Sequence, residues 1–153
     1  MVVSVRTMHC SDDAAVAELL PHLGYSGDAN CIRLRFEALS TWPDNMVFLA
    51  EIEGRVVGLC QVHGVRLIAS DGYAEVAALV VHAEYQRRGI GKLLLGWAGD
   101  WATASGYVRL RLRSGVHREK AHLFYEALGF EKSRASFAFE RHLGQNRSEA
   151  VHE

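Results

Sequence analysis

The sequence lacks a long hydrophobic run and an excess of charge of either sign. No apolar stretch reaches the roughly 18 residues that a membrane-spanning helix requires, and the first residues do not resemble a signal peptide. The 17 Lys and Arg residues against 18 Asp and Glu residues give a net charge of −1. This balance argues against a nucleic-acid binder that works by bulk charge.

Cysteine and proline are also scarce. The three cysteines, Cys10, Cys31 and Cys60, are far apart and form no Cys-x-x-Cys pair. This spacing argues against a disulfide framework and favours a reducing, cytoplasmic location. The two prolines mark no linker, and no repeat is present. We expect a single domain over residues 1–143, followed by a polar tail over 144–153.

Hydrophobic periodicity predicts a chain of alternating strands and helices. Strands are predicted over residues 2–8, 46–53, 55–65, 73–82, 108–113, 130–133 and 136–141. Helices are predicted over residues 11–23, 28–40, 91–105 and 118–128. The order predicts an α/β fold of the α+β type, with a mixed, mostly antiparallel central sheet of about six or seven strands. About four helices are expected to cover both faces of this sheet.

A basic, glycine-containing loop follows the most apolar predicted strand. Residues 86–92 read Gln-Arg-Arg-Gly-Ile-Gly-Lys, and a helix is predicted to begin among them. Glycines at such a turn let backbone N–H groups approach an anion, and the helix dipole adds to the attraction. Two interpretations of the loop remain open: it binds a phosphate or pyrophosphate, or it is a plain basic surface turn. The loop lacks the third glycine of a Rossmann fingerprint and the first glycine of a Walker A loop.

Two stretches resemble signatures of the GNAT superfamily of N-acetyltransferases. Residues 77–95 contain the Gln-x-x-Gly-x-Gly pattern behind an apolar strand, as in the acetyl-CoA signature of that family. Residues 121–130 are similar to its A-x-x-F-Y-x-x-x-G-F block. The resemblance covers about residues 2–143. It implies that two parallel strands splay apart and form a cleft for acetyl-CoA.

The resemblance also implies how the chain would hold acetyl-CoA. The pantetheine arm would pair with the strand backbone, and the pyrophosphate would lie on backbone N–H groups of the loop. Arg118 stands where many members have an asparagine, so we expect only a weak contact there. The implied cofactor-binding residues are Leu79, Val80, Val81, Gln86, Arg87, Arg88, Gly89, Ile90, Gly91, Lys92 and Arg118.

Tyr125 is the first implied catalytic residue. It matches the tyrosine that many GNAT members place near the CoA sulfur. A phenol, with a pKa of about 10, can donate a proton to a departing thiolate. Spacing alone favours a core role, because Tyr125 lies beside Phe124 on the apolar stripe of its predicted helix.

Glu75 is the second implied catalytic residue, as the general base. A carboxylate in so apolar a strand is costly unless it is paired or used, and its position matches the base of histone-acetylating members. By the period of two, Glu75, Ala77, Leu79 and Val81 are predicted to share one face of the sheet. A solvated or arginine-paired glutamate at the strand entrance is the alternative.

Two further groups are open to more than one interpretation. Trp42 and Asp44 lie where the acceptor pocket of the family often forms, and an indole face with a carboxylate would suit an amine. Arg109, Arg111 and Arg113 alternate along a predicted strand. They are typical of a solvated face, and a homodimer interface or a site for an acidic substrate is also open.

The sequence therefore predicts an N-acetyltransferase that moves an acetyl group from acetyl-CoA to a primary amine by direct attack in a ternary complex. The chemistry needs no metal, and no cysteine lies near either signature, which argues against a covalent enzyme intermediate. A small-molecule amine is the expected partner; no membrane is expected, and the sequence carries no strong nucleic-acid signal. A non-catalytic acyl-CoA sensor and an acetyltransferase acting on a protein or another macromolecule remain open.

Overall fold

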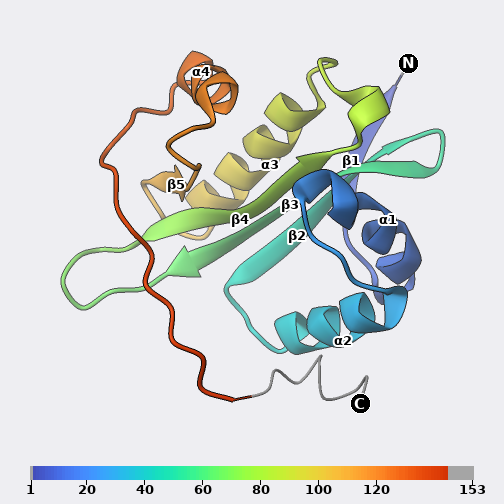
Figure 1. Cartoon of the computed structure of the whole chain (residues 1–153), viewed down its shortest axis with the longest axis horizontal. Coiled ribbons are helices and arrows are strands. Elements are labelled where there is room, and N and C mark those ends of the chain that lie inside the picture. The colour runs from blue at the N-terminus through green and yellow to red at the C-terminus, as the bar shows by residue number, and fades with distance from the viewer. Residues whose placement is uncertain (1, 145–153) are drawn as a thin grey trace. The chain divides into compact units, whose positions relative to one another are not determined.

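The structure, a computed structural model, describes residues 2–144 (Figure 1). The chain divides into two compact units, Met1–Leu112 and Arg113–Glu153. Apart from Gly144, the predicted polar tail lies outside the described residues. Among residues 2–144, no helix has both the length and the hydropathy needed to cross a membrane.

The first unit is built on a five-stranded sheet with the order β1-β2-β3-β4-β5. The strands are β1 (Val3–Thr7), β2 (Asn45–Ile52), β3 (Arg55–Val65), β4 (Tyr73–Val81) and β5 (Leu110–Leu112). Neighbouring strands from β1 to β4 are antiparallel, whereas β4 and β5 are parallel. The β2–β3 hairpin turns at Glu53 and Gly54, whose φ angles of 50° and 79° suit a tight two-residue turn.

Four α-helices accompany these strands in the described part of the chain. They are α1 (Asp13–Leu23), α2 (Ala29–Ser40), α3 (Ile90–Ala104) and, in the second unit, α4 (Glu119–Ala127). Asp28 caps α2, because its carboxylate accepts a hydrogen bond of 2.8 Å from the Cys31 backbone N–H. Gly24 ends α1 in the left-handed region, with φ 91°.

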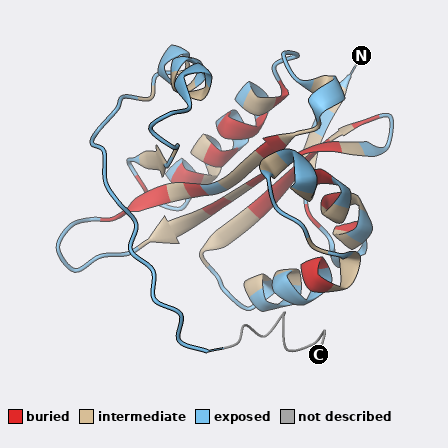
Figure 2. Ribbon diagram, in the orientation of Figure 1, coloured by how far each residue is buried: buried red, intermediate tan, exposed pale blue. Residues whose placement is uncertain are grey.

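Helices cover both faces of the sheet, as the sequence predicts (Figure 1). On one face, Leu49, Leu59 and Val80 pack with α1 and α2 in a hydrophobic core. On the other face, α3 lies so close to Gly58 that a Cβ atom there would be 3.1 Å from the Leu94 side chain. Buried residues on the strands and the inner side of α3 mark these contacts in Figure 2.

A β-bulge in β4 decides which side chains face which helices. Gln61 of β3 pairs with Ala78, but the next β3 residue, Val62, pairs with Val76. Ala77 is therefore an extra residue in β4, and it is exposed although β4 is an inner strand. Such an insertion breaks the alternation of side chains along a strand.

The bulge overturns the prediction that Glu75 shares a face with Leu79 and Val81. Leu79 and Val81 pair with β3 residues on the α3 side of the sheet, where Gly58 lies. Glu75 pairs with His63 and so lies on the α1/α2 face, together with Val80. A regular period of two was the wrong assumption, because the sequence does not show where the extra residue enters the strand.

The expected sixth and seventh strands are absent from the described residues. Residues 130–133 and 136–141 adopt no regular secondary structure, and Phe137 and Phe139 are 90% and 96% exposed. Alternating apolar residues predict a strand only when a neighbouring edge supplies hydrogen bonds and covers the apolar face. No described strand pairs with this segment, so the sheet has five strands.

Candidate active site

Among residues 2–144, no strand pairs with one edge of β4 over its second half. β5 pairs with β4 only at Ala74, Glu75 and Val76. From Ala78 to Val81, β4 is paired with β3 on one side, and no strand of the described chain pairs with its other side. A row of backbone N–H and C=O groups on such an edge can accept an extended ligand as an added strand. The predicted contacts Leu79, Val80 and Val81 lie in this half.

The loop after β4 leads into the N-terminus of α3. Gly89 is the N-cap residue, with φ 79°, and Arg87 also has a positive φ of 64°. The first-turn N–H groups of α3 have no acceptor within the helix, and the helix dipole makes this end attractive to anions. Buried Ile90 anchors the turn, whereas Gln86, Arg87, Arg88, Gly89 and Lys92 are exposed.

Several side chains hold this loop in place. The Gln86 side-chain amide donates a hydrogen bond of 3.2 Å to the Val81 carbonyl, which ties the loop to the end of β4. The Tyr85 ring lies 5.2 Å from the Arg88 guanidinium carbon and 5.6 Å from that of Arg55. Cation–π contacts of this kind position guanidinium groups without neutralising their charge. The loop is therefore an ordered, positively charged turn.

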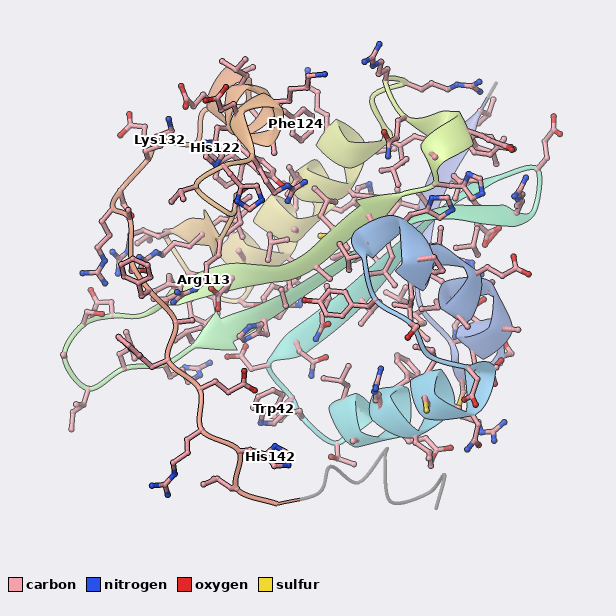
Figure 3. The ribbon with its side chains drawn as sticks, in the orientation of Figure 1. Trp42, Arg113, His122, Phe124, Lys132 and His142 are labelled. Carbon is pink, nitrogen blue, oxygen red and sulfur yellow. The ribbon has the colours of Figure 1, made fainter. Side chains whose placement is uncertain are left out.

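Glu75 lies beside a histidine, His63, that no pattern in the sequence singles out. His63 lies opposite Glu75 in the β3–β4 register, and the Glu75 Oε2 atom is 3.6 Å from His63 Nε2. The His63 ring is stacked on Trp42, with centroids 6.4 Å apart and planes inclined by 14°. Trp42 follows the C-terminal end of α2 (Figure 3). Because the pairing depends on the bulge, the sequence alone does not indicate it.

The contacts of the His63 ring indicate which of its two nitrogens carries a hydrogen. His63 Nδ1 is 3.2 Å from the Gly64 carbonyl oxygen. That oxygen can only accept, so Nδ1 carries a hydrogen. Nε2 then faces the Glu75 carboxylate favourably only if a proton is present on one of the two groups. Their side chains are 22% and 18% exposed, so solvent can reach this pair.

A basic residue flanks Glu75 on the opposite side. Arg111 of β5 is the register neighbour of Glu75. The Arg111 guanidinium carbon lies 4.3 Å from the centroid of the Tyr73 ring, and that of Arg109 lies 5.8 Å from it. Two of the three strand arginines thus pack on an aromatic ring within the first unit.

Asp44 does not supply the carboxylate expected beside Trp42. The Tyr107 hydroxyl donates a hydrogen bond to Asp44, and Arg66 Nε donates another of 3.2 Å. The hydrogen bond to Asp44 raises the pKa of Tyr107 above its usual value. Asp44 is therefore engaged in a structural contact. Glu75 instead places a carboxylate near Trp42, because His63 lies between the two and contacts both.

Cys60 is poorly suited to act as a nucleophile. It is completely buried on β3, opposite Leu79. Burial raises the pKa of the Cys60 thiol to about 12. The group therefore stays a thiol at neutral pH, whereas a nucleophilic cysteine reacts as a thiolate.

In the second unit, Tyr125 is partly buried among aromatic rings of its own segment. Its ring centroid lies 5.4 Å from that of Phe124 and 6.0 Å from that of Phe130. Arg118 is the exposed N-cap residue of α4, and its backbone N–H donates to the Gly115 carbonyl at 3.0 Å. The side chain of Arg118 is thus placed at the surface of this unit.

No metal-binding cluster was found among the described residues. Within residues 2–144, no three His, Cys, Asp or Glu side chains gather closely enough to hold an ion.

Comparison with known proteins gives one family. The sequence model of the acetyltransferase (GNAT) family matches residues 17–130. An uncharacterized N-acetyltransferase of Bacillus subtilis, YhdJ, is 43% identical over 56 residues, which are 36% of this chain and 39% of that protein. An uncharacterized N-acetyltransferase of Methanocaldococcus jannaschii is 30% identical over 102 residues, which are 65% of this chain and 45% of that protein. The chain thus matches less than half the length of these curated relatives.

Solved structures share the fold at low sequence identity. A GNAT family acetyltransferase of Staphylococcus aureus has a TM-score of 0.78 at 21% identity, covering 92% of this chain and all of that one. Glucosamine-6-phosphate N-acetyltransferase of Arabidopsis thaliana has a TM-score of 0.81 at 19% identity, covering 92% and 99%. An aminoglycoside N-acetyltransferase in complex with CoA has a TM-score of 0.81 at 16% identity, covering 93% and 96%.

Proposed function

Because the chain belongs to the GNAT family of acetyltransferases, we propose that it transfers an acetyl group from acetyl-CoA to a primary amine by direct attack in a ternary complex. The observation that carries this proposal is the geometry of β4. Over Ala78–Val81 no strand of residues 2–144 covers its second edge, and the strand leads directly to the basic N-terminus of α3. The Glu75 carboxylate lies just before the bulge on the same strand.

The residues of this region fit acetyl-CoA. The backbone of Leu79, Val80 and Val81 would pair with the pantetheine arm, as an added strand does. The first-turn N–H groups of α3 would hold the pyrophosphate, and Arg87, Arg88 and Lys92 would add positive charge around it. Arg118 is a further, weaker contact. Acetyl-CoA supplies the activated acetyl thioester for the reaction.

Glu75 and His63 would deprotonate the acceptor. A primary amine is a cation at neutral pH, and its nitrogen has no free electron pair until the proton is removed. Glu75 accepts this proton, and His63, 3.6 Å from the carboxylate, shares it and passes it to solvent. Because both side chains lie on the α1/α2 face, the acceptor approaches from that side of the sheet.

Tyr125 would complete the transfer as the general acid. The amine nitrogen bonds to the acetyl carbon while the carbon–sulfur bond breaks, and Tyr125 gives its phenolic proton to the departing sulfur. Support comes from the match between residues 121–130 and the second GNAT signature. The high pKa of buried Cys60 agrees with a route that has no covalent enzyme intermediate.

Mass spectrometry of reaction products tests the proposal. The protein is incubated with acetyl-CoA and a mixture of alkylamines, a polyamine, an amino sugar and short peptides, and free thiol is measured in parallel. Acetylated amine in the same amount as released thiol is the expected result. Binding of acetyl-CoA without acetylation of any amine would contradict the proposal and favour an acyl-CoA sensor. Transfer only to peptides would favour a protein substrate.

A further inference from the structure

An apolar trough lies between the sheet and the two helices α1 and α2. It consists of two adjoining hollows of about 200 and 240 Å³ that share Met8, Phe36, Leu39 and Val47. All of the lining residues belong to the first unit. Protein interiors seldom leave voids of this size, so a hollow that opens to solvent is a candidate ligand site.

The floor of the trough changes from apolar to polar along the sheet. Leu59 pairs with Val80, Gln61 with Ala78, and His63 with Glu75, all on the α1/α2 face. Successive pairs on one face of a sheet are about 7 Å apart. The first two pairs line the trough. A molecule whose body lies over them can therefore present a polar head to the third.

Neither Glu75 nor His63 lines the two hollows, but Trp42 connects the second hollow with this pair. Trp42 lines the second hollow and stacks on the ring of His63. An indole face attracts an ammonium group, and a carboxylate next to it attracts the same charge. The polar end of the trough is therefore suited to an ammonium group.

The charge of the lining selects among classes of amine. Among the described residues that line the two hollows, Arg35 is the only charged one. A polyamine or an aminoglycoside carries several cations, and each would need a carboxylate or water when buried. A sugar also brings hydroxyl groups. The first hollow is lined mainly by apolar side chains, and the Ser40 and Asn45 side chains of the second hollow already donate hydrogen bonds to backbone carbonyls. This lining instead fits a hydrocarbon body.

We infer that the acetyl acceptor is a monoamine with a hydrocarbon body, an alkylamine or arylalkylamine, whose chain occupies the trough and whose amine meets Glu75. This inference rests on the proposed function and narrows its substrate. The trough binds the hydrocarbon by the hydrophobic effect, and Glu75 and His63 receive the ammonium group.

A homologous series of amines from ethylamine to octylamine tests this inference. Each methylene that enters the trough should raise kcat/KM about fourfold, until the trough is full. Spermidine and glucosamine 6-phosphate should be poorer acceptors than hexylamine. A rate that does not depend on chain length, or a preference for spermidine or the amino sugar, would overturn the inference.

Matched leucine substitutions locate the effect in the trough. Ala78→Leu fills the floor of the first hollow, so it should raise the ratio of KM for hexylamine to KM for ethylamine about tenfold. Ala38→Leu adds the same group to an exposed position of α2 that lines neither hollow. It should change neither KM. Equal effects of both variants would count against the trough.

Calorimetry separates failure of this inference from failure of the proposed function. The affinity of the CoA-saturated protein for hexylamine and octylamine reports on the trough without any turnover. Binding that tightens with chain length in the absence of acetylation would uphold the trough and contradict the proposed function. Acetylation of polar amines, with no binding of alkylamines, would uphold the function and overturn the trough.

Discussion

Glu75 of β4 and His63 of β3 are partners on adjacent strands, and their side chains lie on the same face of the sheet. The Glu75 Oε2 atom is 3.6 Å from His63 Nε2. They meet because a single extra residue, Ala77, enters β4 directly after Val76. Arg111 on β5 and Trp42 after α2 are the other neighbours of this pair. The arrangement places a carboxylate, an imidazole and an indole on the face that α1 and α2 cover.

Replacing the carboxylate tests Glu75 as the general base. Glu75→Gln should lower kcat by on the order of 10²–10⁴ at neutral pH, because the amine there remains protonated. The deficit should shrink above pH 9, where free amine becomes abundant. A pH–rate profile of both proteins measures this. Glu18→Gln, on an exposed position of α1, is the matched control. An equal deficit at every pH would assign Glu75 a structural role.

His63 should act together with Glu75, by sharing the proton that the carboxylate takes from the amine. His63→Ala removes the partner of the carboxylate and should lower kcat on the order of tenfold, the cost of about one hydrogen bond to a charged group. His63→Gln keeps a donor and should recover part of the loss. A double-mutant cycle shows whether His63 and Glu75 act together. In the Glu75→Gln background, His63→Ala should cost almost nothing further, whereas additive losses would show that the two residues act independently.

Tyr125→Phe removes the proposed proton donor and keeps the aromatic ring that packs with Phe124 and Phe130. Turnover should fall by on the order of 10²–10⁴, with the affinity for CoA nearly unchanged. Tyr25→Phe, at a 68% exposed tyrosine, provides the control. Parental turnover between pH 6 and 9 would make Tyr125 a packing residue.

Charge reversal at Lys92 tests the anion-binding end of α3. A glutamate in the first turn favours the helix dipole, so Lys92→Glu should fold normally. The variant should lower the affinity for CoA by roughly tenfold at low salt, and by less at high salt because salt screens the charge. Gly96→Glu adds a carboxylate to an exposed position further along the same helix. Calorimetry that shows the same CoA affinity for both variants at low salt would refute the assignment.

The acid stability of the first unit should depend on Asp12. The Asp12 carboxylate accepts two hydrogen bonds of 2.8 Å from the Arg6 guanidinium and one of 2.7 Å from the His9 N–H. These bonds hold its pKa below the usual value. The stabilisation is therefore present above about pH 4 and lost as the pH falls through the folded-state pKa.

Urea unfolding of Asp12→Asn measures this contribution. The variant should be less stable than the parent by about 1–3 kcal/mol at pH 7, and the difference should narrow below about pH 4. Asp100→Asn, on an exposed position of α3, should change little at either pH. A difference that stays constant down to pH 2 would show that the charge of Asp12 is not the cause.

Local signals in the sequence predict most of the elements. Asp28 begins α2 as its cap, Gly24 ends α1, and the Glu53–Gly54 turn joins β2 to β3. These features depend on a few neighbouring residues, and the sequence displays them directly. The family signatures likewise lie within short stretches.

Features that depend on pairing between distant segments could not be predicted from the sequence. The bulge at Ala77 looks like ordinary alternation, so the prediction placed Glu75 on the wrong face and left His63 unnoticed. Residues 130–133 and 136–141 have strand-like alternation but no described partner edge. The hydrogen bonds that Tyr107 and Arg66 donate to Asp44 also join residues far apart in the sequence. Roles for Glu75, Tyr125 and the loop remain predictions.

Initial rates of thiol release, over a grid of acetyl-CoA and hexylamine concentrations, test the central claim most directly. Direct attack in a ternary complex predicts thiol release that requires the amine and double-reciprocal lines that intersect. Parallel lines would indicate a covalent acetyl-enzyme and contradict the proposed route. Thiol release that does not depend on any amine would contradict the assignment of the protein as an N-acetyltransferase.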